Sequence, residues 1–465
     1  MTRDEFQSIY DQGADATFAL FEQLFLRVQA IEERVALNSG NSSKPPSSDG
    51  LNKPSLKPMP QSLRKKSGRK PGAQAGHEGK TLEQTPTPDK VMVHRPVTCQ
   101  HCCAPLSESA PSVTYSRRQV FEIPEPKIIV TEHRAVTLAC PDCGHETGAA
   151  FPEGVGQPVQ YGPNLLGFAT YLHSAHLIPY ARCAEIVRDV TAAPFSPGSL
   201  HRAVRFAYDR LAPFEESVKG GLTNVSVKHV DETGGRVAGK LHWFHVRCTD
   251  SVTWLFRHEK RGGKAAEDLL DYTGTLVSDF WSSYVSLACE HVFCGAHLLR
   301  ELTFVSEVLH QPWAGSLLEE LESAVEGCHA ARARGASRLW DARAVERRFD
   351  RCVAEGLRAN PLPQRGIPKS KARCLAERLS VYRDDYLRFL FDLSLPFTNN
   401  QAERDLRMFK VKGKISGCFR TVEGADLFCR LRSYVATCQK QGRNVLDCLR
   451  SIYAGPLVMP RLNHA

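Results

Sequence analysis

Three acidic residues stand where they could bind divalent metal ions. Asp231 lies at the expected end of the strand-like run NVSVKHVDETGG, and Asp279 at the expected end of the apolar run TLVSDFWSSY. Hard cations such as Mg²⁺ or Mn²⁺ prefer carboxylate oxygens, and two such ions can activate a nucleophile and stabilise the leaving oxygen of a phosphodiester. With Glu403, these acids indicate a site for phosphoryl transfer. The competing interpretation is that isolated aspartates at strand ends only cap backbone groups.

Glu403 belongs to a segment that is rich in cations. Thr398, Asn399 and Asn400 favour the start of a helix just before Glu403. Residues spaced by three or four positions share one face of a helix, so cations should lie beside the acid there. An exposed helix with an ion pair between residues four apart is the simpler alternative. The residues of this segment that we assign to DNA binding are Arg404, Arg407, Lys410 and Lys414.

Two cysteine pairs, Cys99-Gln-His-Cys102 and Cys140-Pro-Asp-Cys143, have the spacing of zinc knuckles. If paired strands in the connector bring the knuckles together, four thiolates can bind one structural Zn²⁺ tetrahedrally. The 37 residues between the pairs exceed the usual spacing, and four ordinary buried cysteines are the alternative. Other potential ligands nearby are His101, Cys103 and His145.

A basic segment precedes the first knuckle. Between Lys44 and Lys80 there are nine lysines or arginines but only two acids, among prolines, serines and glycines. Such a chain can follow a polyanion and displace counterions from its phosphates, although a solvated linker would have the same composition. We assign DNA contacts in this basic arm to Arg64, Lys65, Lys66, Arg69 and Lys70.

The elements that must position the acids are predicted from periodicity. Three short runs with a period of two, a helical segment and a buried apolar strand follow one another from residue 224 to 284. This is the element order of a ribonuclease H-like domain. The fold class is therefore multidomain α+β, with an N-terminal helix, a zinc module, a helical linker domain, and a ribonuclease H-like α/β catalytic domain with a helical insertion.

The predicted boundaries follow shifts in composition. Within the first segment, Phe18, Phe21, Phe25, Val28 and Val35 could form a short dimer seam or dock on their own domain, with Glu32 interrupting the pattern. The predicted divisions are an N-terminal helix at 1–38, a linker and arm at 39–90, a zinc module at 91–150, a helical domain at 160–220, a catalytic domain at 221–440 with its insertion at about 305–395, and a C-terminal tail at 441–465.

The sequence resembles the transposases of the IS66 group of insertion sequences over nearly its whole length. The matching motifs are NSSKPPSSD, GRKPGAQAGHEG, CQHC, CPDCG, HVDET, SDFWSSY, FCGAHLLREL and NNQAERDLRMFKVKGKISGCFRT. The resemblance implies a DDE triad at Asp231, Asp279 and Glu403, a zinc-finger DNA-binding module, and a helical insertion between the last two acids. Cys294, His297 and Arg300 match a Cys-x-x-His-x-x-Arg segment of the family, although a lone histidine after a strand is more often structural.

The expected function is therefore a transposase that binds terminal inverted repeats and target DNA and that cleaves and transfers strands. The chain is expected to act as a dimer or higher oligomer on DNA, together with small accessory proteins. No membrane association is expected. The start of the chain lacks a secretory signal and no long apolar run occurs, so the expected location is the cytoplasm, or the bacterial nucleoid when bound to DNA. A ribonuclease H-like nuclease that acts on branched DNA and a non-catalytic zinc-dependent regulator are the alternatives.

Replacing the five arm cations by alanine should weaken DNA binding at all sequences. If about five phosphate contacts are lost, the slope of log affinity against log salt concentration should fall by roughly four to five units. Binding measured at several salt concentrations provides the test. An unchanged slope would show that the arm is only a linker.

Overall fold

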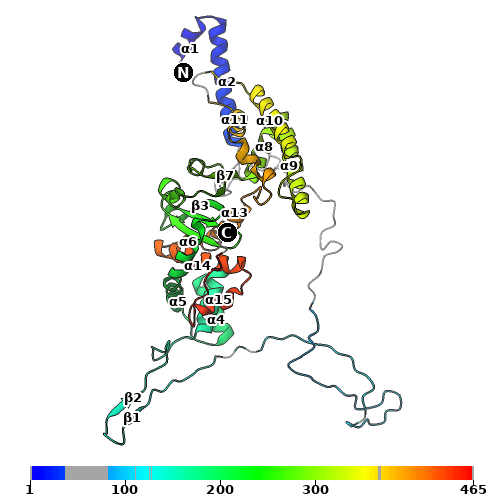
Figure 1. Ribbon diagram of the computed structural model, residues 1–465, viewed down its shortest axis with the longest axis vertical. Helices are drawn as coiled ribbons and strands as arrows, with labels where there is room; N and C mark the ends of the chain where they lie inside the picture. The colour runs from blue at the N-terminus through cyan, green and yellow to red at the C-terminus, as the bar shows by residue number, and fades with distance from the viewer. Residues whose placement is uncertain are drawn as a thin grey trace. The chain divides into compact units, whose positions relative to one another are not determined.

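The computed structural model describes residues 3–36, 82–109, 111–124, 126, 128–364 and 368–462 (Figure 1). The chain divides into two units, Gln61–Ile129 and the remainder, and each is described by itself. The five cations of the basic arm lie outside the described residues. No helix in the described ranges is long and apolar enough to cross a membrane.

A mixed sheet carries the first two acids. Antiparallel pairing joins β3 to β4 and β4 to β5, whereas β6 runs parallel to β3 and β7 runs parallel to β6. The order across this sheet is β5-β4-β3-β6-β7. The predicted three-strand meander and buried fourth strand are thus present. The strands are β3 (Val227–Val237), β4 (Lys240–Cys248), β5 (Thr253–His258), β6 (Thr275–Ser278) and β7 (Glu290–Phe293).

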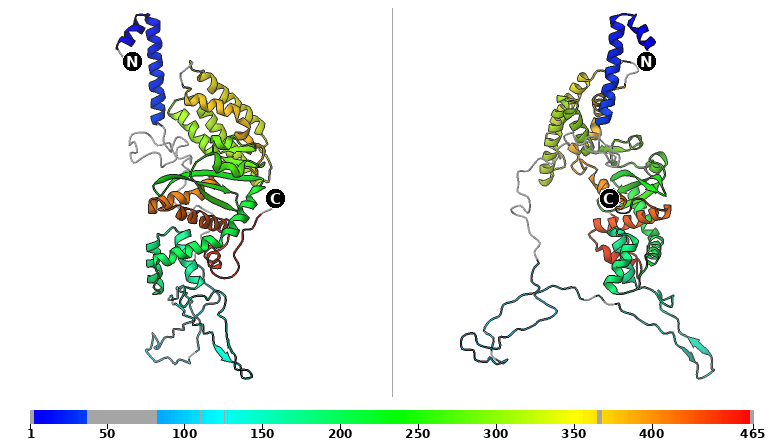
Figure 2. Two further views of the ribbon diagram at one scale, coloured as in Figure 1. Left: turned by 90° about the vertical axis from the view of Figure 1, so that its left-hand side faces the viewer. Right: turned by 180° about the vertical axis from the view of Figure 1, so that it is seen from behind.

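Helices cover both faces of the sheet. One face packs on α13 (Asn400–Ser416) and α14 (Val422–Lys440), the orange helices beside the green sheet in Figure 2. The other face packs on η3 (Gly263–Leu269) and α7 (Ser282–Val285). Where the sequence predicts an α-helix after β5, η3 is a short 3-10 helix.

A separate apolar core holds the helices between Asp279 and Glu403. Apolar residues on one face of each helix, such as Leu317, Leu321 and Phe349, are buried within it. Most of this core lies within the predicted helical insertion, but it also includes Phe293 and residues of the helix that follows it, before residue 305. Its helices are α8 (Gly295–Glu307), α9 (Pro312–Ala333), α10 (Ala342–Ala359), α11 (Lys371–Val381) and α12 (Arg383–Phe391).

The region before the sheet is helical, as predicted, and it shares a core with the end of the chain. Residues 441–465, predicted as a tail, include α15 (Val445–Ser451), whose Leu449 is fully buried in this core with Phe214 and Tyr434. The Asn444 side chain caps α15 by accepting hydrogen bonds from the backbone N–H groups of Leu446 and Asp447. The other members are α3 (Pro163–Thr170), η2 (Tyr171–Ala175), α4 (Tyr180–Thr191), α5 (Pro197–Arg210) and α6 (Ala212–Thr223).

The N-terminal segment forms α1 (Arg3–Tyr10) and α2 (Ala14–Ala36). Four residues of the predicted seam on α2 are exposed, with Phe18 and Phe25 at 72% and 70%. The side chain of Val35, the last seam residue, is outside the described part of the chain. The seam therefore stays a prediction.

Candidate active site

Asp231 and Asp279 lie on the same face of the sheet. His229 of β3 pairs with Val277 of β6. Asp231 lies two residues after His229, and Asp279 lies two residues after Val277. Alternate residues of a strand point to the same side, so both carboxylates share the face covered by α13. Asp279 directly follows β6, as predicted. Asp231, however, is not at the end of its strand, because β3 continues to Val237 through pairing with β4.

The two aspartates repel each other in a partly buried place. Loss of water contact raises the pKa of Asp231 well above its usual range, and Glu232, Asp279 and Glu403 raise it further. For Asp279, desolvation and the Glu232 and Glu403 carboxylates raise the pKa to about 7. The Oδ1 atom of Asp279 is buried and has no hydrogen-bond partner among the described residues. An unpartnered acid oxygen surrounded by negative charge is suited to a cation.

Glu232 and Arg261 are charged neighbours that the sequence analysis did not identify. The Glu232 side chain is only 1% exposed, and it accepts hydrogen bonds from Tyr284 Oη at 2.7 Å and Arg261 Nε at 2.9 Å. The Arg261 guanidinium lies over the rings of Trp243 and Trp281. Arg261 lowers the pKa of Asp279 and opposes the effect of Glu232. A hint in the sequence was the adjacent pair of acids in HVDET, whose second member must face the opposite side of the strand.

Asn399 fixes the start of α13 against the sheet. This residue is 2% exposed, and its Nδ2 donates to the Val230 carbonyl at 2.7 Å while its Oδ1 is hydrogen-bonded to His229 Nδ1 at 2.9 Å. Its carbonyl accepts the Glu403 N–H at 3.2 Å. Sequence reasoning assigned Asn399 to helix capping. It occupies the capping position, but its side chain makes no capping bond and instead joins α13 to β3.

Glu403 is on α13 but lies close to α8. Its Oε1 is 3.9 Å from His297 Nδ1, and with Cys294 these residues place one ligand atom each within 4.8 Å of one another. Asp231, Asp279 and Glu403 do not form such a close group in the described chain. Burial and the cations Arg300 and Arg378 lower the pKa of His297 to about 3, so its ring is neutral.

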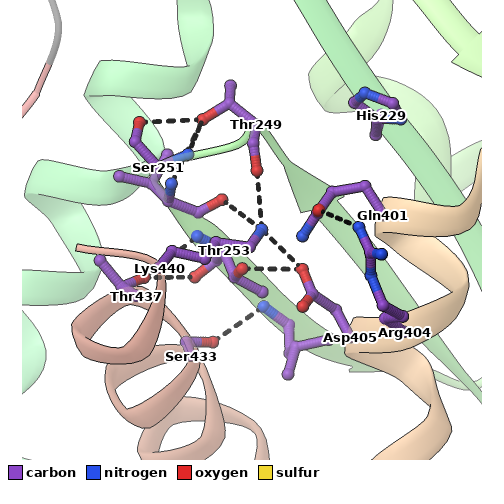
Figure 3. Close-up of polar contacts among 12 residues, drawn as sticks. His229, Thr249, Ser251, Thr253, Gln401, Arg404, Asp405, Ser433, Thr437 and Lys440 are labelled. Carbon is purple, nitrogen blue, oxygen red and sulfur yellow. Dashed lines mark hydrogen bonds and ion pairs between the residues drawn. The ribbon is translucent and has the colours of Figure 1, made fainter. Parts of the chain in front are cut away.

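The opposite side of α13 is anchored by a different acid. Asp405 accepts hydrogen bonds from Thr253 Oγ1 and Lys440 Nζ, both at 2.8 Å, and the Asp405 and Lys440 side chains are 10% and 9% exposed (Figure 3). Asp405 is therefore engaged with β5 and α14. The four cations predicted to bind DNA from this helix, Arg404, Arg407, Lys410 and Lys414, are all exposed.

Each cysteine knuckle has its own local geometry. Backbone N–H groups of Cys102 and His101 point to the Cys99 sulfur and lower the pKa of its thiol. The corresponding groups of Cys143 and Asp142 lower the pKa of Cys140. Both thiols are thereby prepared to bind metal as thiolates.

Most of the strand predicted between the knuckles does not form, and only its last residues pair in the described part of the chain. Only β1 (Thr137–Ala139) and β2 (Glu146–Gly148) form in the described part of this region, and they enclose the second knuckle alone. The connector is rich in β-branched residues, but its side chains, including Val113 at 99% and Val120 at 89%, are exposed and have no core to pair around. The two knuckles belong to different units of the chain.

Comparison with known protein families identifies the family of this chain. The family described as "Transposase IS66 family" matches residues 158–427, more than half of the chain. The chain belongs to the IS66 transposase family. The family described as "zinc-finger binding domain of transposase IS66" matches residues 96–144, and one described as "Family of unknown function (DUF6444)" matches residues 6–83. No curated protein matches the chain.

The predicted site residues of this IS66 transposase fall within the two matched ranges. Asp231, Asp279 and Glu403 fall in the transposase match. All four knuckle cysteines fall in the zinc-finger match, which supports Zn²⁺ as a cofactor and DNA as a partner. Cys294 and His297 also lie in the transposase match.

Replacing Asp279 by Asn should stabilise the metal-free protein. Since the pKa of Asp279 is about 7 in the fold and close to 4 in an unfolded chain, ionisation destabilises the fold progressively between these pH values and fully above 7. The variant should gain about 1–3 kcal/mol at pH 8 and nothing at pH 4. Thermal melts in chelator at both pH values measure this difference. The prediction is wrong if the stability gained over wild type is the same at pH 8 as at pH 4.

Proposed function

We propose that Asp231, Asp279 and Glu403 form a DDE triad that binds two divalent ions and that cleaves and transfers DNA strands at the ends of an insertion sequence. The observation that carries the proposal is the pair of aspartates on one face of the sheet, with raised pKa values and an unpartnered Asp279 oxygen. Glu403 enters from the helix that covers this face.

The strand arrangement supports a ribonuclease H-like catalytic domain. Three antiparallel strands followed by two parallel ones, in the order β5-β4-β3-β6-β7, give the arrangement expected for that fold. The helices α9 to α12 lie between the second and third acids, where the family resemblance places an insertion. The insertion helices pack in one apolar core that also includes Phe293 of β7.

The residues fit Mg²⁺ or Mn²⁺. Carboxylate oxygens are the preferred ligands of these ions, and positive charge would offset the desolvation and the repulsion that together raise both aspartate pKa values. When bound, a pair of such ions activates a water or 3′-hydroxyl and stabilises the leaving oxygen. Within the chain, Asp231 on β3 and Asp279 directly after β6 supply ligands, and Arg261 pairs with Glu232 on the opposite face of β3.

Glu403 completes the triad by rotating from His297 toward the aspartates. Its side chain is 38% exposed, so this movement disrupts no core packing. The Glu403 carboxylate contributes to the raised pKa of both aspartates, which supports its assignment to the same site. Asn399 keeps the backbone of Glu403 in place during the movement.

DNA contacts are proposed for three regions of the chain. The zinc module, with Cys99, Cys102, Cys140 and Cys143 around one ion, and the basic arm bind the element ends. Exposed cations of α13 hold phosphates beside Glu403. Two copies on paired ends and small accessory proteins complete the proposed assembly. A nuclease specific for branched DNA would share the acids but would not join a cut 3′ end to new DNA.

Replacing any one triad acid by its amide should abolish cleavage and strand transfer. The amide keeps the shape but removes the negative charge that holds the cations, and we expect a loss of roughly 1,000-fold or more, with double variants little worse. The assay uses purified protein, labelled element-end DNA and Mg²⁺ or Mn²⁺, and end binding should survive.

Glu423→Gln is the matched control for this assay. Glu423 lies in the first turn of α14 and pairs with Arg205 on the surface at 3.2 Å, so its replacement should leave cleavage unchanged. If Glu403→Gln instead cleaved at a rate near that of wild type, Glu403 would not be the third acid. Cleavage without joining would support the nuclease.

Freshly purified protein should contain one zinc ion per chain in the cysteine module. Removing the ion should unfold this module and weaken end binding, because such small domains depend on the metal for their fold. Elemental analysis of wild type and of Cys102→Ser measures the stoichiometry. Zinc-free wild-type protein that still binds element ends would refute the assignment.

A further inference from the structure

Cys294, His297 and Glu403 combine a thiol, an imidazole and a carboxylate in one small group. Their ligand atoms lie within 4.8 Å of one another, and the 3.9 Å between His297 Nδ1 and Glu403 Oε1 already suits neighbouring ligands of one ion. Tetrahedral ligands with bonds of about 2.0–2.3 Å lie about 3–4 Å apart. Only a small adjustment of the three side chains would therefore close such a site.

The backbone holds two of these ligands together. Cys294 precedes the first residue of α8, and His297 lies three positions later, where its N–H donates to the Cys294 carbonyl at 3.1 Å. The buried Cys294 sulfur accepts the N–H of Asn399 at 3.2 Å, which brings the start of α13 to the same point. His297 Nδ1 is buried and has no hydrogen-bond partner among the described residues.

We propose that Cys294, His297 and Glu403 bind a thiophilic transition-metal ion such as Zn²⁺ at a site distinct from the cysteine module. Thiolate and imidazole ligands select Zn²⁺ or Co²⁺ over Mg²⁺, which prefers oxygen. Three protein ligands leave the fourth position of a tetrahedral ion open to water. The ion must displace the thiol proton, since burial raises the pKa of Cys294 to about 11.

This site shares Glu403 with the triad. One carboxylate cannot face His297 and the two aspartates simultaneously, so Zn²⁺ held at Cys294 and His297 withdraws the third acid from the catalytic ions. Zinc should therefore inhibit strand cleavage in competition with Mg²⁺. This consequence rests on the proposed function, whereas binding of the ion does not.

The test is Co²⁺ titration of the full-length chain with its cysteine module already loaded with zinc. Wild type should bind one additional Co²⁺ and develop thiolate-to-cobalt absorption. Cys294→Ser should lack that absorption, and His297→Gln should weaken binding by at least about tenfold. Cys183→Ser is the matched control, because Cys183 is also buried and makes one hydrogen bond, to the Ile178 carbonyl. It should behave as wild type.

The proposal is overturned if wild type develops no such absorption, or if the absorption persists in Cys294→Ser. Thermal melts identify variants that fail to fold. If Cys294→Ser or His297→Gln fails to fold, Glu403→Gln is used instead, because Glu403 is partly exposed. This variant should also weaken Co²⁺ binding about tenfold. Cobalt binding that depends on Cys294, together with full cleavage activity in Glu403→Gln, would retain the metal site and refute the triad.

Discussion

The arrangement around the catalytic face depends on one electrostatic constraint, the repulsion among carboxylates gathered in a partly desolvated place. Asp231 and Asp279 lie on the same face of the sheet, Glu403 approaches from α13, and Glu232 lies on the reverse side of β3. Without a cation, desolvation and this repulsion shift both aspartates toward their protonated forms. Arg261 and Tyr284 satisfy Glu232, which leaves the unpartnered Asp279 oxygen as the place where positive charge is most needed.

Rigid backbone contacts make this repulsion tolerable. Asp231 lies on β3 and Asp279 directly follows the adjacent parallel strand β6, while Asn399 joins β3 to the start of α13. On the other side of α13, the buried Asp405–Lys440 pair ties the helix to β5 and α14. The helix that bears Glu403 is thus held on both sides, while the Glu403 side chain stays partly exposed. Such a division between a fixed backbone and a partly exposed ligand suits a site that binds metal and DNA in succession.

The sequence predicted the sheet because strand periodicity and the turns between strands are local signals. It placed Asp279 at the end of a strand correctly, since the polar residues Ser278 and Asp279 interrupt the apolar run directly after Val277. The end of β3 was misjudged because Thr-Gly-Gly after Glu232 is typical of a turn, yet pairing with β4 extends the strand to Val237. The roles of Asn399 and Arg261 depend on contacts with residues far away in the sequence, including Val230 and Trp281, and no local pattern could reveal them. The cap of α15 at Asn444, by contrast, was a local signal that could have been used.

The most direct measurement is backbone cleavage by hydroxyl radicals generated at Fe²⁺ substituted for Mg²⁺. If the three acids hold one ion cluster, cuts should occur around Asp231, Asp279 and Glu403 together, and excess Mg²⁺ should suppress all three. Asp279→Asn should weaken all three sets of cuts, because the site is shared. Cuts confined to the segments of Cys294, His297 and Glu403, with none near Asp231 or Asp279, would contradict the account.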